Sequence, residues 1–260
     1  MTEINVSNVY YRYGETENFV LSDLNLRFPS GRVTTLLGPN GSGKTTLLKI
    51  MLGFITPQRG SVTIDRRELS SYSRIRLSKL VTWVPQDEEL SFPYTVRDYL
   101  LMGRSPHLGF LEAPGMQDQL IVDKVLKELD IPIMFLEREL TQLSGGERRL
   151  ILIARALVQE TQALILDEPT AHLDLGNKSR ALQVIMEMSK AGRTMVFSSH
   201  DPNEALLIAE HVVILNEGRV VTQGTPEDVI TESLLKEVYG VNVRIFREND
   251  RVSVDMDFTG

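Results

Sequence analysis

Cysteine is absent from the 260-residue chain, and only four histidines occur. The absence of cysteine excludes disulfides, thiolate zinc sites, iron–sulfur clusters and a cysteine nucleophile, and four histidines argue against a histidine-based metal centre. Basic residues are fewer than acidic ones, 28 against 35, which gives a formal net charge of −7. Because phosphate binding relies on clustered positive charge, this balance argues against nucleic acid as a partner.

Long hydrophobic runs are absent as well. No stretch of about 18 apolar residues occurs, so the sequence predicts no membrane-spanning helix, and residues 1–14 lack the apolar core of a signal peptide. We therefore expect a cytoplasmic protein, which only a partner would bring to a membrane. The hydrophobic fraction of 42% is that of a folded chain, and the length suits one large domain or two small ones.

Short apolar runs alternate with helical segments in the first and last parts of the chain. Four runs have the composition of parallel strands that are buried on both faces, at residues 33–37, 163–166, 194–198 and 212–215. Helices are expected over residues 43–53 and 174–190. This alternation predicts a doubly wound parallel sheet. Two strand-like runs before it, at 4–13 and 20–28, predict an antiparallel pair.

The middle of the chain, from about Thr95 to Val158, has a helical rather than a strand-like sequence pattern. Thr95 is a predicted helix N-cap, and a later group of apolar residues shares one helix face at a period of 3.6 residues, namely Val122, Val125, Leu126 and Leu129. No strand pattern interrupts this part, which predicts a mainly helical insertion. Beyond the sheet, Thr225 and Pro226 predict a helix start, and residues 241–258, alternating around 248–250, predict a β-hairpin.

The first functional motif is a phosphate-binding loop. Residues 38–45 match the pattern G-x-x-x-x-G-K-[ST] without a mismatch, between a predicted strand and a predicted helix. Its glycines allow backbone N–H groups to surround phosphate oxygens at a helix N-terminus. Lys44 would reach the β- and γ-phosphates, and the Thr45 hydroxyl would bind Mg²⁺. The predicted nucleotide-binding residues here are Gly38, Pro39, Asn40, Gly41, Ser42, Gly43, Lys44, Thr45 and Thr46.

Two acidic residues end the predicted strand at 163–166. Proteins with a phosphate-binding loop need an acid at a neighbouring strand end to hold Mg²⁺, and Asp167 follows the strand directly. Glu168 comes one residue later, where its side chain would point differently and could polarise the attacking water. The sequence therefore predicts Asp167 as the metal acid and Glu168 as the general base for ATP hydrolysis.

A second glycine-rich turn, Leu143 to Glu147, precedes a predicted helix. Ser144 and Glu147 have the spacing of a capping box, yet a plain cap does not need two glycines, each of which costs up to about 1 kcal/mol relative to alanine. Gly145 and Gly146 instead suggest a close approach of phosphate to the helix N-terminus. Since this turn has no lysine and no metal acid, it would complete the site of a second copy, in a twofold head-to-tail dimer that encloses two nucleotides.

Together, these motifs resemble those of the ATP-binding-cassette (ABC) ATPase family, over about residues 1–230. LSGGE at 143–147 resembles the signature motif of that family, and it lies between the phosphate loop and LILDE at 164–168. The resemblance implies that Tyr13 stacks on adenine and that Gln86 contacts Mg²⁺ and joins the helical insertion to the core. It also implies that Asp174, in the D-loop, crosses the dimer interface, and that His200 contacts the γ-phosphate as the switch histidine.

The expected fold is α/β, with a RecA-like P-loop core, an N-terminal antiparallel β subdomain and a mainly α-helical insertion. The expected division has three parts: residues 1–86 and 160–230 as the ATP-binding core with its β subdomain, 87–159 as the helical subdomain with the signature motif, and 231–260 as a C-terminal helix and β-hairpin. Catalytic roles are expected for Glu168, His200 and Gln86, with ATP as the ligand and Mg²⁺ held by Thr45, Gln86 and Asp167.

The branch of the family is suggested by TVRD at 95–98 and GRSPH at 103–107, which resemble ATPases that import iron–siderophores, haem, vitamin B12 and related metal chelates. The resemblance implies a homodimer at the cytoplasmic face of the membrane, a separate transmembrane permease and, indirectly, a substrate-binding protein. The stretch Leu90, Phe92, Pro93 and Tyr94 is the predicted permease contact, because aromatic rings beside charges are common at interfaces. An exporter or lipid-transport ATPase and a non-transport regulatory clamp remain the alternatives.

Overall fold

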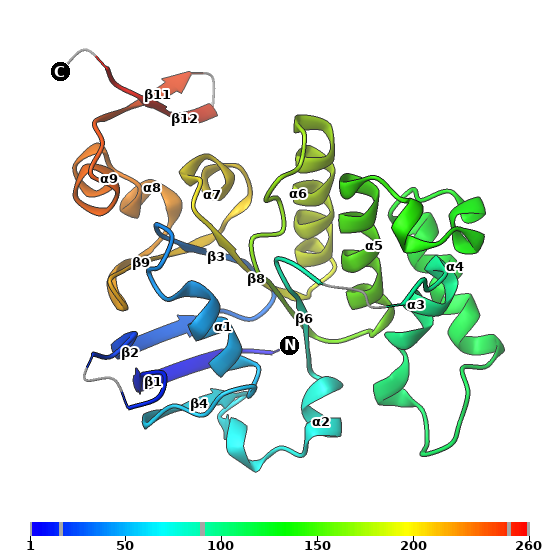
Figure 1. Cartoon of the computed structure of the whole chain (residues 1–260). Helices are drawn as coiled ribbons and strands as arrows, with labels where there is room; N and C mark the ends of the chain where they lie inside the picture. Colours follow the sequence, from blue (N-terminus) through cyan, green and yellow to red (C-terminus); the bar gives the residue numbers. More distant parts are fainter. Residues whose placement is uncertain (1, 16–17, 89–91, 249–250, 259–260) are drawn as a thin grey trace.

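The computed structural model describes residues 2–15, 18–88, 92–248 and 251–258. Its centre is a six-stranded sheet in the order β10-β9-β3-β8-β7-β6 (Figure 1). Neighbouring strands run parallel except β10, which returns antiparallel to β9. The strands are β3 (Val33–Leu37), β6 (Val81–Val84), β7 (Ala163–Leu166), β8 (Thr194–Ser199), β9 (His211–Asn216) and β10 (Arg219–Gly224).

The parallel strands bury side chains on both faces, which explains their continuous apolar sequences. In β7, Leu164 and Leu166 belong to a core shared with α5 (Gly145–Val158) and α6 (Leu175–Lys190). The alternate residues of the same strand belong to a second core shared with α1 (Lys44–Met51). The expected doubly wound sheet, with helices on both faces, is confirmed.

A second, antiparallel sheet covers the far side of α1 (Figure 1). Its order is β2-β1-β4-β5, and β1 pairs antiparallel with both β2 and β4. The strands are β1 (Ile4–Tyr11), β2 (Leu21–Phe28), β4 (Arg59–Ile64) and β5 (Arg67–Glu68). The predicted antiparallel pair is therefore the first half of a larger sheet, which packs the amphipathic helix of the phosphate loop between two layers.

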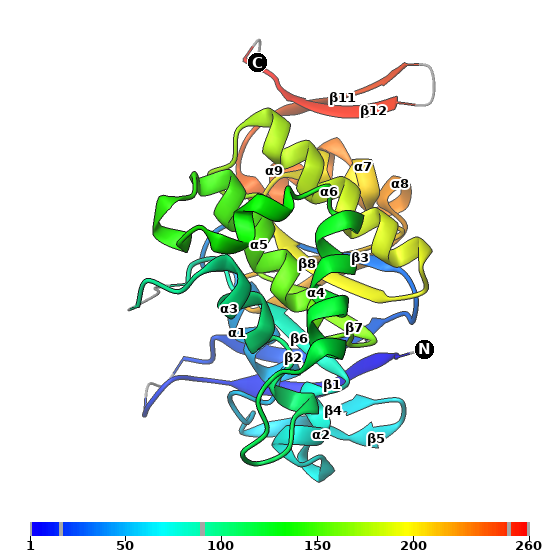
Figure 2. The same ribbon diagram turned by 90° about the vertical axis from the view of Figure 1, so that its right-hand side faces the viewer.

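The helical part consists of α3 (Val96–Met102), α4 (Met116–Glu128) and α5. It lies beside the sheets in Figure 1 and therefore in front of them in Figure 2. The Thr95 hydroxyl caps α3 by accepting a hydrogen bond from Asp98 N at 3.1 Å, as predicted. Short 3₁₀ turns connect the helices at Ser105–His107, Ile133–Glu137 and Leu140–Gln142. The predicted apolar face from Val122 to Leu129 is buried against α3 and α5.

After the sheet come α7 (Pro202–Ile208), α8 (Pro226–Val229), α9 (Glu232–Tyr239) and a hairpin of β11 (Val243–Glu248) and β12 (Arg251–Met256). Thr225 caps α8 as predicted, and the predicted hairpin forms, although its turn residues Asn249 and Asp250 lie outside the described residues. Among those described, no helix is both long and apolar enough to span a bilayer.

Several elements had no sequence prediction. They are β4, β5, β6, β10, the helix α2 (Arg74–Ser78) and a 3₁₀ turn at Leu69–Ser71. The strand β6 has four residues and stops before Pro85, and β10 alternates between exposed and half-buried positions at the edge of its sheet. Such segments become strands only because a neighbouring strand supplies hydrogen-bond partners, which a local pattern does not reveal.

Candidate functional site

The phosphate-loop sequence connects β3 to α1, at the carboxyl end of the parallel sheet. The N-cap of α1 is Gly43 in the left-handed conformation (φ 101°), and no side chain caps the helix. Gly41 also has a positive φ, of 80°. The first N–H groups of α1 therefore remain available to an anion, which is what a phosphate site at a helix N-terminus requires.

Packing explains why glycine is needed at two positions of this loop. A Cβ on Gly38 would lie 2.1 Å from the Leu215 carbonyl oxygen of β9, and a Cβ on Gly43 would lie 2.6 Å from Leu21. Both distances are far below normal contact, so a larger residue would push the loop away from the sheet. The Ser42 hydroxyl beside Gly43 is buried and has no hydrogen-bond partner within the described part of the chain.

Lys44 is folded back into this loop. Its side chain is 5% exposed, and Nζ donates hydrogen bonds to the carbonyl oxygens of Gly38 at 2.8 Å and Pro39 at 3.1 Å. Glu168 Oε1 lies 3.7 Å from the same ammonium. Burial lowers the pKa of Lys44, and the nearby carboxylates of Glu168 and Asp167 oppose that shift. An arriving phosphate would give this confined cation a stronger partner than the carbonyls do.

The two acids after β7 point to different partners, as the sequence predicts. Asp167 is buried, and Ser198 Oγ of β8 donates to its Oδ1 at 2.6 Å. The same Ser198 oxygen accepts a hydrogen bond from Glu168 N at 2.8 Å. Glu168 has a positive φ of 43°, an uncommon backbone conformation for glutamate. This backbone turn separates the directions of the two carboxylates.

His200 follows β8 and completes a contact across the strand ends. Its Nδ1 lies 3.4 Å from Glu168 Oε2, while 55% of its side chain remains exposed. Glu168 thus lies between the ammonium of Lys44 and the imidazole of His200. The parallel register explains this proximity, because β7 and β8 are adjacent strands that end at the same edge of the sheet.

A cavity of about 600 Å³ adjoins these groups. Asn40 of the phosphate loop, Gln86 after β6, Glu168 and His200 all line it. Four strand-end or loop segments that are far apart in the sequence therefore meet at one hollow. Among the described residues no cluster of three His, Cys, Asp or Glu side chains could hold a metal alone. Asp167, Gln86 and Thr45 offer only oxygen donors, which fits Mg²⁺ completed by phosphate and water.

Tyr13 lies at the edge of the phosphate loop. Its hydroxyl is 3.2 Å from Thr46 Oγ1, its ring meets Tyr11 edge-on at 4.9 Å, and 46% of the residue is exposed. The ring is thus held near the first turn of α1 with a surface open to solvent. That placement suits the predicted stacking on a base.

The signature turn begins α5 with the predicted capping box. Glu147 N donates to Ser144 Oγ at 3.3 Å and Ser144 N donates to Glu147 Oε2 at 2.8 Å. A Cβ on Gly146 would lie 2.2 Å from the Asn177 side chain, so contact within the chain accounts for that glycine. A Cβ on Gly145 would meet nothing within 4 Å. Gly145 is therefore the glycine that the chain's own packing leaves unexplained.

Ser144, Gly145, Gly146 and Asp174 do not line the cavity beside the phosphate loop. Gly145 instead lines a neighbouring hollow with Gln86. Asp174 is the N-cap of α6, with Asn177 N donating to Oδ1 at 2.9 Å and Asn177 Nδ2 donating to Oδ2 at 2.8 Å. These two hydrogen bonds lower the pKa of the Asp174 carboxyl. The predicted site is thus in two parts within one chain.

Arg149 connects these parts and was missed by the sequence analysis. It lies in α5, is 5% exposed, and donates to the carbonyl oxygens of five residues at 2.6–2.9 Å, namely Pro85, Gln86, Asp167, Glu168 and Pro169. Burial lowers the pKa of its guanidinium and nearby carboxylates oppose that shift. The available signal was a second arginine, directly before the apolar residues 150–154 of the helix that follows the signature motif.

Fold and site together define a P-loop nucleotide-binding protein with a second glycine-rich helix N-terminus. A family model described as ABC transporter matches residues 21–171, more than half of the chain. The hemin import ATP-binding protein of Rhodococcus jostii is 35% identical over 87% of this chain and 76% of its own. The iron(3+)-hydroxamate import ATP-binding protein of Bacillus subtilis is 33% identical over 94% of this chain and 90% of its own.

Solved structures agree with these relatives. An ABC transporter assigned to the metal-chelate type, in an inward-facing conformation, matches with a TM-score of 0.85 at 29% identity, over 98% of this chain and 96% of its own. A dimeric ATP-binding cassette bound to ADP and Pi matches with a TM-score of 0.74 at 25% identity, over 86% of this chain and 98% of its own. The chain belongs to the ABC transporter family, as one of its ATP-binding, ATP-hydrolysing proteins.

Proposed function

We propose that this chain is the ATPase subunit of an importer for a metal chelate, such as an iron–siderophore, haem or cobalamin, and that it acts as a homodimer beneath a separate permease at the cytoplasmic face of the membrane. The observation that carries the proposal is the meeting of Lys44, Glu168 and His200 beside the phosphate loop. The cargo class is supported by the relatives that import hemin and iron(3+)-hydroxamate.

The residues divide the chemistry of hydrolysis among themselves. The N–H groups of residues 41–46 and the ammonium of Lys44 would bind the phosphates, and Thr45, Asp167 and Gln86 would hold Mg²⁺, which neutralises charge on the phosphates when bound. Glu168 would accept the proton of the attacking water, because its carboxylate reaches the cavity next to Lys44. His200, in contact with Glu168, would orient the γ-phosphate.

The variant Glu168→Gln tests the general base. It preserves shape but cannot accept a proton, so ATP turnover should fall by roughly 10²–10⁴-fold while ATP binding, measured by titration with a fluorescent analogue, persists. Glu187→Gln is the matched control, since Glu187 is an exposed glutamate of α6. Turnover within a factor of two of the parent chain would remove Glu168 from this role.

The dimer follows from the divided site. Gly145 lies at an open helix N-terminus, and the signature turn lies outside the cavity beside its own phosphate loop. A second copy, turned head to tail, would place that turn over the first copy's phosphates, with Ser144, Gly145, Gly146 and Asp174 at the interface. The related dimeric cassette bound to ADP and Pi supports this arrangement.

The lack of cysteine makes the dimer simple to test. One batch of chain would carry only Asn40→Cys and a second only Ser144→Cys, both with Glu168→Gln to retain ATP. Mixed and oxidised with ATP, they should form a disulfide between unlike chains, and without ATP far less of it. The head-to-tail model would be contradicted if disulfides joined only two Asn40→Cys chains. It would also be contradicted if ATP did not raise the amount of disulfide between unlike chains.

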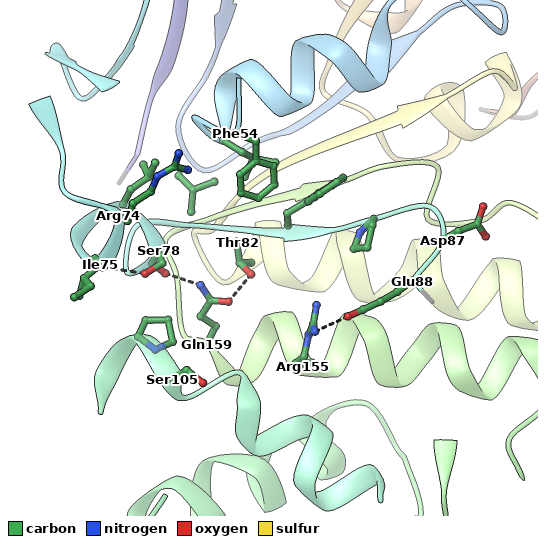
Figure 3. Close-up of a pocket in the computed structure, with 16 residues that line it drawn as sticks. Phe54, Arg74, Ile75, Ser78, Thr82, Asp87, Glu88, Ser105, Arg155 and Gln159 are labelled. Atoms are coloured by element: carbon green, nitrogen blue, oxygen red, sulfur yellow. Dashed lines mark hydrogen bonds and ion pairs between the residues drawn. The ribbon is translucent and has the colours of Figure 1, made fainter. Parts of the chain in front are cut away.

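The permease would dock in a groove between the core and the helical part. This groove, of about 780 Å³, lies between α2 and β6 on one side and α5 with residues 105–106 on the other (Figure 3). Gln159 bridges its floor, accepting from Thr82 Oγ1 at 2.7 Å and donating to Ser78 O at 2.5 Å. The groove adjoins Gln86, because Pro85, Asp87 and Glu88 line one end of it.

The lining of the groove suits an amphipathic helix of the partner. Ile75 and Phe54 are 67% and 49% exposed, and the Phe54 ring lies 5.1 Å from that of Trp83. The buried Trp83 Nε1 has no hydrogen-bond partner within the described part of the chain, so it could donate to a docked segment. Arg74 and Asp87 stand at opposite ends of the groove, whereas the Glu88 side chain turns inward and pairs with Arg155 at 2.9 Å (Figure 3). Apolar anchors inside a charged rim are typical of helix-in-groove recognition.

The described residues of the predicted permease contact, Phe92, Pro93 and Tyr94, do not line this groove. Tyr94 packs against the helical core, whereas Phe92 is 64% exposed and its ring lies 5.9 Å from that of Tyr94. Leu90 lies outside the described residues.

Ile75 is a better probe of permease binding than Tyr94, because the Tyr94 ring packs against the helical core. Ile75→Glu should abolish co-purification with the permease without lowering the unfolding temperature, whereas Ile133→Glu, at an isoleucine 68% exposed and outside the groove, should change neither. Equal retention of the permease by both variants would reject the groove.

A further inference from the structure

The segment that follows His200 is held by several other elements. The helix α7 begins at Pro202, and Asp201 caps it by accepting from Asn203 N at 2.9 Å. Lys178 Nζ of α6 donates to Asp201 Oδ2 at 2.8 Å and lies 2.9 Å from Glu204 Oε1. The His200 side chain itself is half exposed and contacts Glu168. Its position therefore depends on the main chain around it, which these bonds fix.

Asn203 ties the same turn to the C-terminal hairpin. Its Oδ1 accepts a hydrogen bond from Val254 N at 2.8 Å, and its Nδ2 donates to Val254 O at 3.0 Å. One amide side chain thus pairs with both main-chain groups of a single residue of β12. The hairpin lies outside the two larger sheets (Figures 1 and 2), so this pair is a contact between the edge of the molecule and the segment after His200.

The hairpin also belongs to an apolar core that reaches the end of β3. Val254 is 7% exposed and shares a core with Ala205 of α7, Leu235 of α9 and Leu37, the last residue of β3 before the loop. Packing is incomplete next to Asn203, where a cavity of about 360 Å³ is lined by His200, Asn203, Tyr239 and Val254. The two hydrogen bonds of Asn203 therefore cross an interface that apolar side chains fill only in part.

We propose that Asn203 is a positioning residue, and that the C-terminal hairpin fixes His200 through the pair formed by the Asn203 side chain and the Val254 main chain. This rests on the proposed role of His200 at the γ-phosphate. The tail of the chain then contributes to hydrolysis without touching the nucleotide. Loss of a hydrogen-bonded pair of this kind, with a histidine displaced by a fraction of an ångström, should slow the chemical step rather than weaken ATP binding.

The first measurement separates turnover from binding in the full-length chain. Asn203→Ala removes both hydrogen bonds and should lower kcat for ATP several-fold, because a displaced His200 slows the chemical step, with KM within about a factor of two. Asn203→Asp keeps an oxygen acceptor for Val254 N but loses the donor to Val254 O. Its kcat should therefore lie between those of the parent chain and Asn203→Ala. Ser253→Ala, at an exposed hairpin residue next to Val254, is the control and should match the parent chain.

The second measurement does not depend on activity. The chain has four histidines, so ring resonances in NMR spectra of histidine-labelled protein can be assigned with one His200→Gln sample. Asn203→Ala should move the His200 resonance and leave those of His107 and His211, and Ser253→Ala should move none. An unmoved His200 resonance would overturn the proposal, even if kcat fell. If the resonance moves but His200→Gln hydrolyses ATP at the parental rate, the positioning is right and the assigned role of His200 is wrong.

Should Asn203→Ala fail to fold, Asn203→Asp provides both readouts. Asn203→Asp keeps one of the two hydrogen bonds to Val254, so the chain should stay folded. Its His200 resonance should move less than in Asn203→Ala. A folded Asn203→Asp chain with parental kcat and an unmoved His200 resonance would also overturn the proposal.

Discussion

Arg149 offers the sharpest test of how the two halves of the site are held together. Its guanidinium donates to five carbonyl oxygens, on the loop after β6 and the loop after β7, and is almost completely buried. Arg149→Met keeps a chain of similar length but removes every donor. Several carbonyls would then be buried without their partner, among them those of Asp167 and Glu168.

The magnitude follows from the burial of these groups. A hydrogen bond to a charged group contributes about 1.5–3 kcal/mol. Five bonds to one side chain are not additive, so we expect a total close to that of two such bonds. We therefore expect Arg149→Met to lower the free energy of unfolding by about 3–5 kcal/mol, a large share of the roughly 5–15 kcal/mol typical of a folded protein.

The assay is urea unfolding followed by circular dichroism. With a denaturant slope near 3 kcal/mol per molar, the midpoint should fall by about 1–2 M. The urea midpoint of Arg149→Lys should lie between those of the parent chain and Arg149→Met, because an ammonium with three donors cannot reach five carbonyls. Arg148→Met is the control, since Arg148 is half-buried and donates a hydrogen bond to the Glu88 carbonyl oxygen. A loss below about 1 kcal/mol for Arg149→Met, or equal losses for both neighbours, would refute the reasoning.

Two further predictions concern other parts of the structure. Gly38→Ala should abolish binding of a fluorescent ATP analogue and lower the unfolding temperature, because its Cβ would meet Leu215 O at 2.1 Å; unimpaired binding would show that the loop can shift. The hydrogen bond from Arg104, and then that from Gly115 N, lowers the pKa of the Asp118 carboxyl below its ordinary 3.8. The interaction of Asp118 with Arg104 should therefore stabilise the fold at pH values above 3.8. This stabilisation should be lost as the pH falls through the lower pKa that Asp118 has in the folded chain. The stability difference between the parent chain and Asp118→Asn, from urea unfolding between pH 7 and pH 3, should shrink on acidification, and a constant difference would contradict the pKa shift.

The sequence by itself determined the phosphate loop, the acidic strand end and the helix caps. Each depends on residues that are close in the chain: the glycines and lysine at 38–45, the adjacent pair Asp167 and Glu168, and the cap of Ser144 by Glu147. Backbone conformation and helix termini obey local rules, so a local pattern is sufficient. Apolar runs likewise predicted the buried strands of the parallel sheet, because burial on both faces requires them.

Only the tertiary structure decided which distant groups meet. The contacts of Glu168 with Lys44 and His200 arise because β3, β7 and β8 end at one edge of the sheet. The carbonyl partners of Arg149 lie in segments 18–64 residues away, and the partner of Asn203 lies 51 residues away in the hairpin. Main-chain acceptors have no residue type, so no sequence motif records them. The edge strands β5 and β10 depend in the same way on neighbours that only the fold supplies.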